Sequence, residues 1–494
     1  MSALRAPAAE AIPHLGEALR ALLSGADGVA DDAPRLVAAT VPIPPIDPIA
    51  LYSAAVESGE EAALLTRQAD DVSFVGVGAA WAIGPEGPAR FRVAEAAWQA
   101  LLSDARLSVA AGGRPSADGQ TTDGAGGPVL LGGLGFTGRT PDPEDPWGPF
   151  GAASLVLPSI LVASTRDGTW LTGSLVERAD DAASDRLEST FERLAGRARD
   201  LTPNLGGITA RPVSTPLRIV HEQPDAAGWD HLVGLFAGAV GRGRLDKVVL
   251  ARRVDIASPL EFDVPNALRR LAMSAPESTI YAFRRGGRTF LGATPERLVR
   301  TEGRRFWSAA IAGTVARGDD AAADAALAAE VLASEKEREE HGVVVATLRE
   351  QLAPITSELR ISETPRVLPL RHVQHLVSDV EGTLLERVGL LQLAERLHPT
   401  PAVGGEPRDL ALALIEEHEG FDRGWYAGPI GWLGADGDGE LSVALRCGIV
   451  ERTKATLFAG CGIVADSDPR REWEESTIKL RAVASALGRP EEGL

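Results

Sequence analysis

The segment that begins at Trp229 constrains the fold most, because from there on helical and strand patterns follow one another in long, well-marked stretches. Apolar residues at helical spacing predict a helix over 229–240 that Gly241 and Gly243 end, and the apolar run 248–256 predicts a strand. Further segments are β-rich at 279–299 and 428–450 and helical at 320–352 and 469–487. This order of elements predicts a mixed α/β domain of the α+β type, with sheets covered by helices.

Composition and charge narrow the class of protein. Of the 494 residues 44% are hydrophobic, which is enough for a substantial core, and 50 basic against 69 acidic side chains give a net charge of −19. That charge opposes the phosphate attraction behind most nucleic-acid affinity and argues equally against an anionic membrane surface. The N-terminal residues resemble an amphipathic helix rather than a signal peptide, no apolar run approaches a membrane span, and two cysteines cannot build a disulfide framework. We expect a soluble cytoplasmic protein that binds neither nucleic acid nor membranes.

Lysine is unusually rare in this chain. Only four of the 50 basic residues are Lys, and the other 46 are Arg. A guanidinium does not lose its proton whereas an ammonium can, so a Lys retained among so many Arg more often has a chemical task. This reasoning draws attention to each of the four, Lys247, Lys336, Lys454 and Lys479, although codon bias explains the Arg excess itself.

Two familiar motifs are present but poorly placed for their usual chemistry. The glycines at 133, 135 and 138 satisfy GxGxxG, but the prolines at 141, 143 and 146 forbid the helix that a dinucleotide site needs. His372 and His375 form HxxH on a predicted strand, where residues three apart point to opposite faces. Neither motif predicts a cofactor site.

Carboxylates at helical spacing predict a cation site instead. Glu337 and Glu340 lie three residues apart on one predicted helix, and Glu472, Glu475 and Lys479 share one face of another. Pairs of carboxylates on two helices suit a hard, oxygen-seeking cation such as Mg²⁺ that keeps some of its waters. Exposed helices also carry such pairs without any ion, so the spacing alone leaves both interpretations open.

Ten further segments resemble, in the same order, the motifs of one known family. They are LDKVVLARR, FLGATPERLVR, AAIAGTVARG, SEKEREEH, HLVSDVEGTL, LHPTPAVGGEPR, FDRGWYAGPIGW, VALRCGIV, LFAGCGIV and EWEESTIKL. On these motifs the chain is identified as a member of the chorismate-binding enzymes, which include isochorismate, salicylate, anthranilate and aminodeoxychorismate synthases. The resemblance implies the fold of anthranilate synthase component I, with large antiparallel sheets packed face to face and covered by helices.

The resemblance also implies a division of the chain. Residues 226–494 correspond to the chorismate-binding catalytic region. Residues 1–225 correspond to the variable N-terminal part of the same fold, and within them the glycine-rich segment 110–127 is predicted to be a mobile surface loop.

The resemblance assigns the two chemical roles to Lys247 and Glu296. Lys247 matches the general base that activates water for attack at C2 of chorismate, and Glu296 matches the acid that protonates the departing C4 hydroxyl. Lys247 must then lose its proton near neutral pH and Glu296 must keep one, which burial and neighbouring charges can arrange. Without this context, Lys247 reads as a surface residue and Glu296 as an ion-pair partner of Arg297.

The remaining site residues follow from the same resemblance. Mg²⁺ is expected to hold the ring carboxylate, with Glu340 and Glu475 as direct ligands and Glu337 and Glu472 acting through water. The other expected substrate-binding residues are His375, Ala402, Tyr426, Arg446, Gly460, Gly462, Lys479, Gly313 and Thr314. A bidentate Arg and glycine-exposed amides suit a carboxylate, but Arg446 could cross-pair on a sheet, Tyr426 could be core, and the glycines could mark a bulge.

Individual residues point to one member of the family. Lys247 and Ala402 favour water over ammonia as the nucleophile, because the ammonia-using relatives lack the Lys and have Thr at the second position. Ala312 stands where another branch has a nucleophilic Lys. We therefore predict a Mg²⁺-dependent isochorismate synthase that needs no glutaminase subunit, more similar to the menaquinone type than to the siderophore type. The alternatives are a salicylate synthase or an isochorismate synthase of the siderophore branch, which makes 2,3-dihydroxybenzoate. An anthranilate or aminodeoxychorismate synthase subunit with a glutaminase partner is less favoured.

Overall fold

The computed structural model describes most of the chain. The described residues are 14–22, 35–109, 127–176, 185, 188–193, 196, 210, 213–318, 320–369, 373–386 and 388–490. The predicted mobile loop lies outside them except for Gly127, and so do the side chains of Thr314 and Glu340. Predictions for those positions therefore stay predictions.

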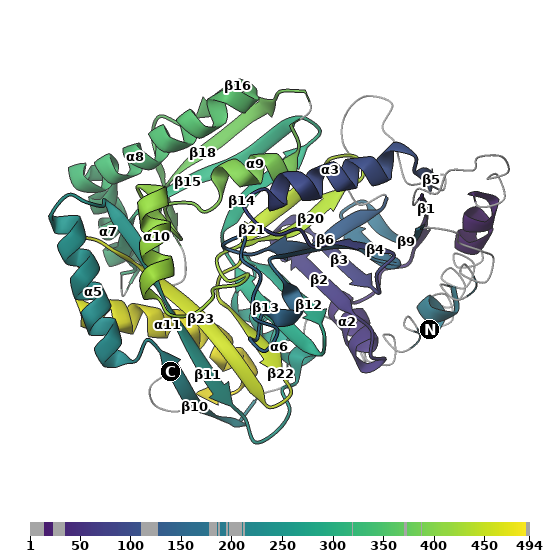
Figure 1. Cartoon of the computed structure of the whole chain (residues 1–494), viewed down its shortest axis with the longest axis horizontal. Coiled ribbons are helices and arrows are strands. Elements are labelled where there is room, and N and C mark those ends of the chain that lie inside the picture. Colours follow the sequence, from purple (N-terminus) through teal and green to yellow (C-terminus); the bar gives the residue numbers. More distant parts are fainter. Residues whose placement is uncertain are drawn as a thin grey trace.

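Two mainly antiparallel sheets, packed against each other and flanked by helices, form the described part of the molecule (Figure 1). Strands from the first 225 residues enter both sheets, so the two halves of the sequence build one framework. The mixed α/β architecture predicted from the sequence is confirmed.

Within the described residues the larger sheet has 14 strands. Their order is β24 (Arg489–Pro490), β10 (Pro216–Gln223), β11 (Lys247–Ala257), β23 (Lys454–Ile463), β22 (Cys447–Glu451), β13 (Arg288–Thr294), β12 (Thr279–Arg285), β2 (Ala62–Arg67), β3 (Val72–Val77), β8 (Ile160–Thr165), β9 (Gly168–Val176), β1 (Leu36–Ile43) and β5 (Arg106–Val109), with β19 (Gly405–Glu406) beside β11. Only the β1–β5 and β10–β24 pairs among these are parallel.

The smaller sheet has ten strands in the same described residues. Their order is β16 (Thr356–Ile361), β18 (Val373–Leu384), β15 (Arg305–Ala316), β14 (Arg297–Glu302), β21 (Gly439–Val443), β20 (Pro429–Gly434), β6 (Val129–Leu134), β7 (Ala153–Leu157) and β4 (Trp81–Ile83), with β17 (Arg366–Pro369) beside β18. The strand β6, which contains the start of the GxGxxG motif, pairs with β7 and β20 and leads into no helix, as the following prolines predicted.

Helices cover the outer faces of this pair of sheets. They are α2 (Pro48–Glu57), α3 (Arg90–Ser103), α5 (Ala226–Gly241), α6 (Val264–Ser274), α7 (Ala321–Ala333), α8 (Glu335–Leu352), α9 (Leu390–Leu397), α10 (Arg408–His418) and α11 (Pro469–Leu487). Side-chain caps set several of their starts: Ser334 separates α7 from α8 and accepts from the amide of Glu337, and Asp468 accepts from the amide of Arg471. No helix in the described part of the chain combines the length and apolar composition that crossing a membrane requires.

The core has two layers because strand side chains alternate between the faces of the larger sheet. On β12, Tyr281 and Phe283 belong to the layer between the sheets, whereas Ile280 and Ala282 belong to the layer beneath α2, α6 and α11. Packed aromatic rings fill the intersheet layer, as in the contact of Trp147 with Phe290 at 4.9 Å between ring centroids. Such a filled core holds the two sheets at a fixed separation.

Two short crossovers carry the chain from one sheet to the other. Pro295 and Glu296 join β13 of the larger sheet to β14 of the smaller one, and residues 444–446 return from β21 to β22. The crossovers lie side by side: the amide of Val443 donates to the carbonyl of Glu296 at 2.9 Å, and that of Ala293 donates to the carbonyl of Arg446 at 3.1 Å. The junction between the sheets therefore brings Glu296 and Arg446 together.

Candidate active site

Lys247 begins strand β11 and is half-buried. Its side chain lies over Gly462 of the neighbouring strand β23, where a Cβ atom would come within 2.4 Å of the lysine Cε. The register between the two strands is regular from Val248 to Ala257, so Gly462 marks no bulge. Its lack of a side chain instead makes room for the lysine.

Glu296 stands in the crossover between β13 and β14, with its amide donating to the Thr294 hydroxyl at 3.3 Å. Burial raises the pKa of its carboxyl to about 7, although the positive charges of Arg446, Lys247 and Lys479 oppose that rise. A carboxyl with this pKa is about half protonated at neutral pH, so it can donate a proton. These influences place Glu296 within electrostatic reach of Arg446, Lys247 and Lys479.

Arg446 lies in the second crossover with a left-handed backbone, φ +48. It does not continue a strand, because β22 begins only at Cys447. Burial lowers its pKa from the ordinary arginine value, and Glu475 and Glu296 are among the groups that oppose this shift. A buried guanidinium facing carboxyl groups is suited to hold a carboxylate ligand.

His375 enters the site from β18 of the smaller sheet, opposite a bulge in β15. The bulge falls at Gly313, whose φ of +79 favours glycine, and the ring of His375 forms a hydrogen bond with the backbone there. Burial and the charges of Lys479 and Lys247 lower the pKa of His375 to about 4, so the ring is neutral at pH 7. Thr314 pairs with His375 through the backbone.

Tyr426 is buried and stacks on Phe458 at 5.5 Å between ring centroids. Its hydroxyl faces Gly460, where a Cβ atom would lie 2.8 Å from the oxygen, and Lys479 of α11 donates to the Gly460 carbonyl at 2.8 Å. Strand β22 pairs with β23 only as far as Phe458, so β22 does not pair with the backbone of β23 around Gly460. Tyr426 is thus a core residue whose polar end borders the site.

A close pair of carboxylates, Glu472 and Glu475, lies on helix α11. Ligand atoms of Glu472, Glu475 and Cys461 lie within 4.8 Å of one another, and Glu475 also pairs with Lys479 at 2.6 Å. Burial and the neighbouring Glu475 both raise the pKa of Glu472. Carboxylates held this close repel each other unless a cation lies between them, so this pair fits a divalent ion.

The opposite helix α8 provides the other predicted ligands. A Cβ atom at Gly313 would lie 3.3 Å from a carboxylate oxygen of Glu337, so this side chain faces the bulge beside His375. Glu337 does not belong to the close group on α11 in the described part of the chain. The side chain of Glu340 lies outside the described residues.

A cavity of about 360 Å³ adjoins Lys247. Ala402 and Ala312, the two positions used to choose among family members, both line it, together with apolar side chains from α5 and α8. The small alanine side chains leave this space open next to the amine. Lys247, Ala312 and Ala402 therefore line one connected cavity.

Comparison with known proteins shows the family to which the chain belongs. Residues 21–488 match the family described as "Chorismate binding enzyme". This protein belongs to the chorismate-binding enzyme family. The family predicted from the ten motifs is confirmed, and with it the prediction of an enzyme.

Several characterised chorismate-binding enzymes are similar over most of their length. The chain is 36% identical to the salicylate biosynthesis isochorismate synthase of Pseudomonas aeruginosa, covering 95% of this chain and 94% of that one. It is 34% identical to the isochorismate synthase MenF of Bacillus subtilis, over 73% and 75% of the two chains.

A solved structure shares the fold across nearly the whole chain. It is the menaquinone-specific isochorismate synthase MenF of Escherichia coli, with a TM-score of 0.71, 25% identity, and coverage of 96% of this chain and 99% of that one. Anthranilate synthase component I of Streptococcus pneumoniae, at 21% identity, matches with a TM-score of 0.66 over 84% and 92% of the two chains. The predicted fold is confirmed.

Sequence reasoning overlooked a buried ion pair that lies beside this candidate site. Arg423 and Glu419 lie in the core; Arg423 donates to the carbonyls of Val249 and Val403, and Glu419 accepts from the amide of Ala251. The Arg423–Glu419 pair therefore makes hydrogen bonds to β11 that a neighbouring strand would otherwise make. Through the carbonyl of Val403 it also connects β11 to the segment that contains Ala402. The FDRGW motif contains Arg423, but only the fold reveals what it contacts.

Proposed function

We propose that this protein is an isochorismate synthase that converts chorismate to isochorismate by adding water at C2 and removing the C4 hydroxyl. The observation that carries the proposal is a buried carboxyl, Glu296, that feels the charge of Lys247 and whose pKa of about 7 lets it act as an acid. The similarity to isochorismate synthases over 95% of the chain supports it.

In the proposed reaction Lys247 takes a proton from water as the water oxygen bonds to C2. The ring double bonds shift, the C4–O bond breaks, and Glu296 gives its proton to the departing hydroxyl, so that water leaves. Lys247 must begin neutral and Glu296 must begin protonated. The two charges that result are then returned to their starting states by proton exchange with solvent.

Arg446, Lys479 and the backbone around Gly460 are proposed to hold the carboxylates of the substrate. A guanidinium provides two parallel donors, and it costs little to place them where a planar carboxylate binds. His375 is proposed to contact the ring in its neutral form. Tyr426, Gly462, Gly313, Thr314 and Ala402 complete the proposed pocket.

We further propose that the enzyme depends on Mg²⁺. Glu475 and Glu472 would hold the ion on α11, and Glu340 and Glu337 would complete the set from α8. When bound, Mg²⁺ neutralises and anchors the ring carboxylate of chorismate. The close, mutually repelling carboxylates of α11 support this assignment.

The test is to incubate the purified protein with chorismate, with and without Mg²⁺, and to separate the products by chromatography. Isochorismate as the product supports the proposal, and salicylate with pyruvate would support the salicylate synthase alternative. No conversion of chorismate would overturn both. Activity in the purified protein alone would also support the expectation that no glutaminase subunit is needed.

The pathway that uses the product is proposed to be menaquinone synthesis. This part rests on the similarity of WYAGPIGW and AGCGIV to the menaquinone type, while the relative from Pseudomonas aeruginosa is named for salicylate synthesis. Expression in a bacterium that lacks its menaquinone-specific enzyme should restore menaquinone. Restoration of a salicylate- or dihydroxybenzoate-derived siderophore alone would overturn the menaquinone assignment.

A further inference from the structure

The position of Glu296 depends on how the two sheets are held together. Strand β13 ends at Thr294 in the larger sheet and β14 begins at Arg297 in the smaller one, so only Pro295 and Glu296 lie between them. Lys247 belongs to the larger sheet alone. A shift of one sheet against the other would therefore move the carboxyl of Glu296 relative to the amine of Lys247.

A compact group of four charged residues joins the sheets immediately next to this crossover, and we call it the intersheet clamp. It consists of Arg67, Asp70, Arg297 and Glu440. Arg297 pairs with Asp70 at 2.6 Å and with Glu440 at 2.9 Å, while Arg67 lies 3.1 Å from Asp70 and 3.8 Å from Glu440. Each arginine thus contacts both acids.

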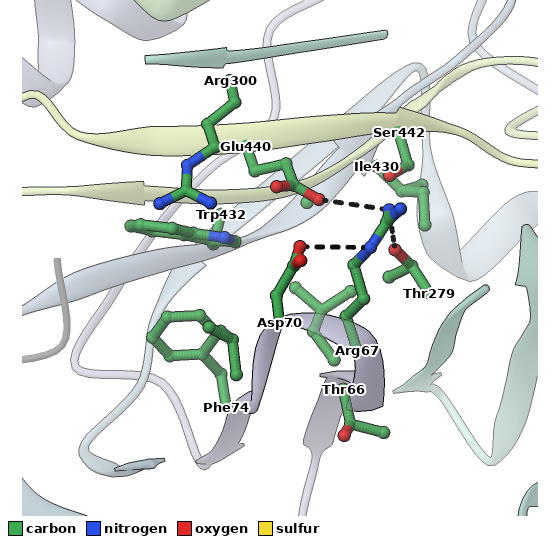
Figure 2. Close-up of a pocket in the computed structure, with 13 residues that line it drawn as sticks. Thr66, Arg67, Asp70, Phe74, Thr279, Arg300, Ile430, Trp432, Glu440 and Ser442 are labelled. Atoms are coloured by element: carbon green, nitrogen blue, oxygen red, sulfur yellow. Dashed lines mark hydrogen bonds and ion pairs between the residues drawn. The ribbon is translucent and has the colours of Figure 1, made fainter. Parts of the chain in front are cut away.

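The clamp spans the junction because its members come in pairs from the two sheets. Arg67 ends β2 and Asp70 lies in the short 3₁₀ turn that follows, so both belong to the larger sheet. Arg297 begins β14 and Glu440 lies on β21, both in the smaller sheet. Figure 2 shows Arg67, Asp70 and Glu440 converging, with Arg67 also reaching Thr279.

The surroundings favour a fixed geometry for the clamp. Glu440 and Arg67 are 12% and 19% exposed at the side chain, and they line a small pocket together with Phe74 and Trp432, whose rings lie 4.8 Å apart. Burial and the adjacent Arg297 lower the pKa of Arg67, while Glu440 and Asp70 oppose that shift. The acids are therefore what keep the two arginines close together.

Glu296 and Arg297 are consecutive in the sequence, but their side chains interact with different groups. Arg297 pairs within the clamp, whereas the charges that act on Glu296 belong to Arg446, Lys247 and Lys479 across the active site. An influence of Arg297 on Glu296 must then pass through the backbone that they share. Isolated ion pairs near the surface add little stability, so a four-membered group at this point is better explained by geometry.

We propose that the intersheet clamp positions Glu296 for proton donation, with Arg297 as its central positioning residue. This inference rests on the proposed isochorismate synthase activity. None of the clamp residues is among the proposed substrate or metal ligands; the clamp fixes the distance from the acid to the base. Losing it lets the carboxyl of Glu296 move away from the departing hydroxyl.

The experiment compares Arg297→Met and Asp70→Asn with the wild type and with Glu451→Gln. The last variant is a matched control, because Glu451 forms a 3.1 Å ion pair with Arg288 inside the larger sheet. In the two clamp variants we expect kcat to fall about tenfold or more, since small misplacements of catalytic groups are costly. KM for chorismate and the melting temperature should stay close to those of the control.

The pH dependence of kcat distinguishes the proposal from a loss of folded protein. A loss of folded protein would lower kcat without shifting its pH profile. Release of the clamp exposes Glu296 to water while Arg446, Lys247 and Lys479 still face it, so its pKa falls and the alkaline limb of the profile moves to lower pH. Arg297→Lys, which keeps a cation, should recover most of the lost turnover.

Several outcomes would overturn the inference. One is a kcat within twofold of wild type in both clamp variants, and another is a loss that only follows melting temperature with an unchanged pH profile. If Arg297→Met does not fold, the milder Asp70→Asn decides by the same criteria. A wild-type protein that makes no isochorismate would instead overturn the proposed function.

Discussion

The two charged groups at the junction of the sheets differ in how their charges balance. In the intersheet clamp, two arginines meet two acids, and each charge has an opposite partner within 4 Å. In the active site the buried carboxyl of Glu296 feels the charges of Arg446, Lys247 and Lys479, and Lys479 also pairs with Glu475. The charges of the clamp meet only one another, whereas those of the active site are proposed to meet a substrate and a metal ion as well.

The difference matters because the clamp is suited to a structural role, whereas Glu296 is suited to proton transfer. Paired charges in a closed group resist movement and have no proton to give. A buried carboxyl whose pKa is about 7 exchanges its proton at neutral pH. Both arrangements lie one residue apart along the chain, at Glu296 and Arg297, so the same crossover serves both purposes.

Among the expected effects, removal of the Lys247 amine should reduce the turnover of chorismate most. Lys247→Ala takes away the proposed base from a half-buried position, so we expect turnover of chorismate to fall by about 10²–10⁴-fold while the fold is retained. Lys454→Ala, at the exposed far end of β23, is the matched control and should turn over normally. Normal turnover in Lys247→Ala would reduce the active site to a binding pocket.

The carboxylates of α11 allow a test of the proposed Mg²⁺ site. Glu475→Gln should raise the Mg²⁺ concentration needed for half-maximal activity by about 10–100-fold, and Mn²⁺ binding followed by electron paramagnetic resonance should weaken in parallel. Glu474→Gln is the control, because Glu474 is exposed and pairs with Arg470 on the solvent side. Equal Mg²⁺ dependence in both variants would exclude Glu475 as a ligand.

A smaller effect is expected from crowding the amine rather than removing it. Gly462→Ala places a methyl group within 2.4 Å of the Lys247 Cε, so the lysine must move, and we expect kcat to fall about tenfold. Gly234→Ala, on α5 with nothing within 4 Å of the added atom, is the control and should keep full activity. An unchanged kcat in Gly462→Ala would show that the amine position is not critical.

The smallest predicted change concerns pH. Glu296 acts in its protonated form, which is complete well below its pKa of about 7 and is lost as the pH rises through that value. We expect kcat/KM at pH 7 to be about half of its value on the plateau of the acidic side of this limb, and to keep falling above it. A profile that stays flat across neutral pH would contradict the role of Glu296 as the acid.

Much of this protein follows from local sequence pattern. The strand at β11, the helix α11 and the absence of a helix after β6 were all predicted, because residue spacing and proline act over a few residues. The stretch 320–352 proved to be two helices, since Ser334 caps a second one inside it. The roles of Lys247 and Glu296 came from resemblance rather than from pattern.

The sequence by itself determined which residue types are available: a rare lysine, spaced glutamates and glycines at defined positions. The tertiary structure decided what they do. Arg297 meets Asp70 from 227 positions away, and Glu296 gains its raised pKa from burial between two sheets. A pKa depends on burial and on charges that distant segments bring close, so it exists only once the chain has folded.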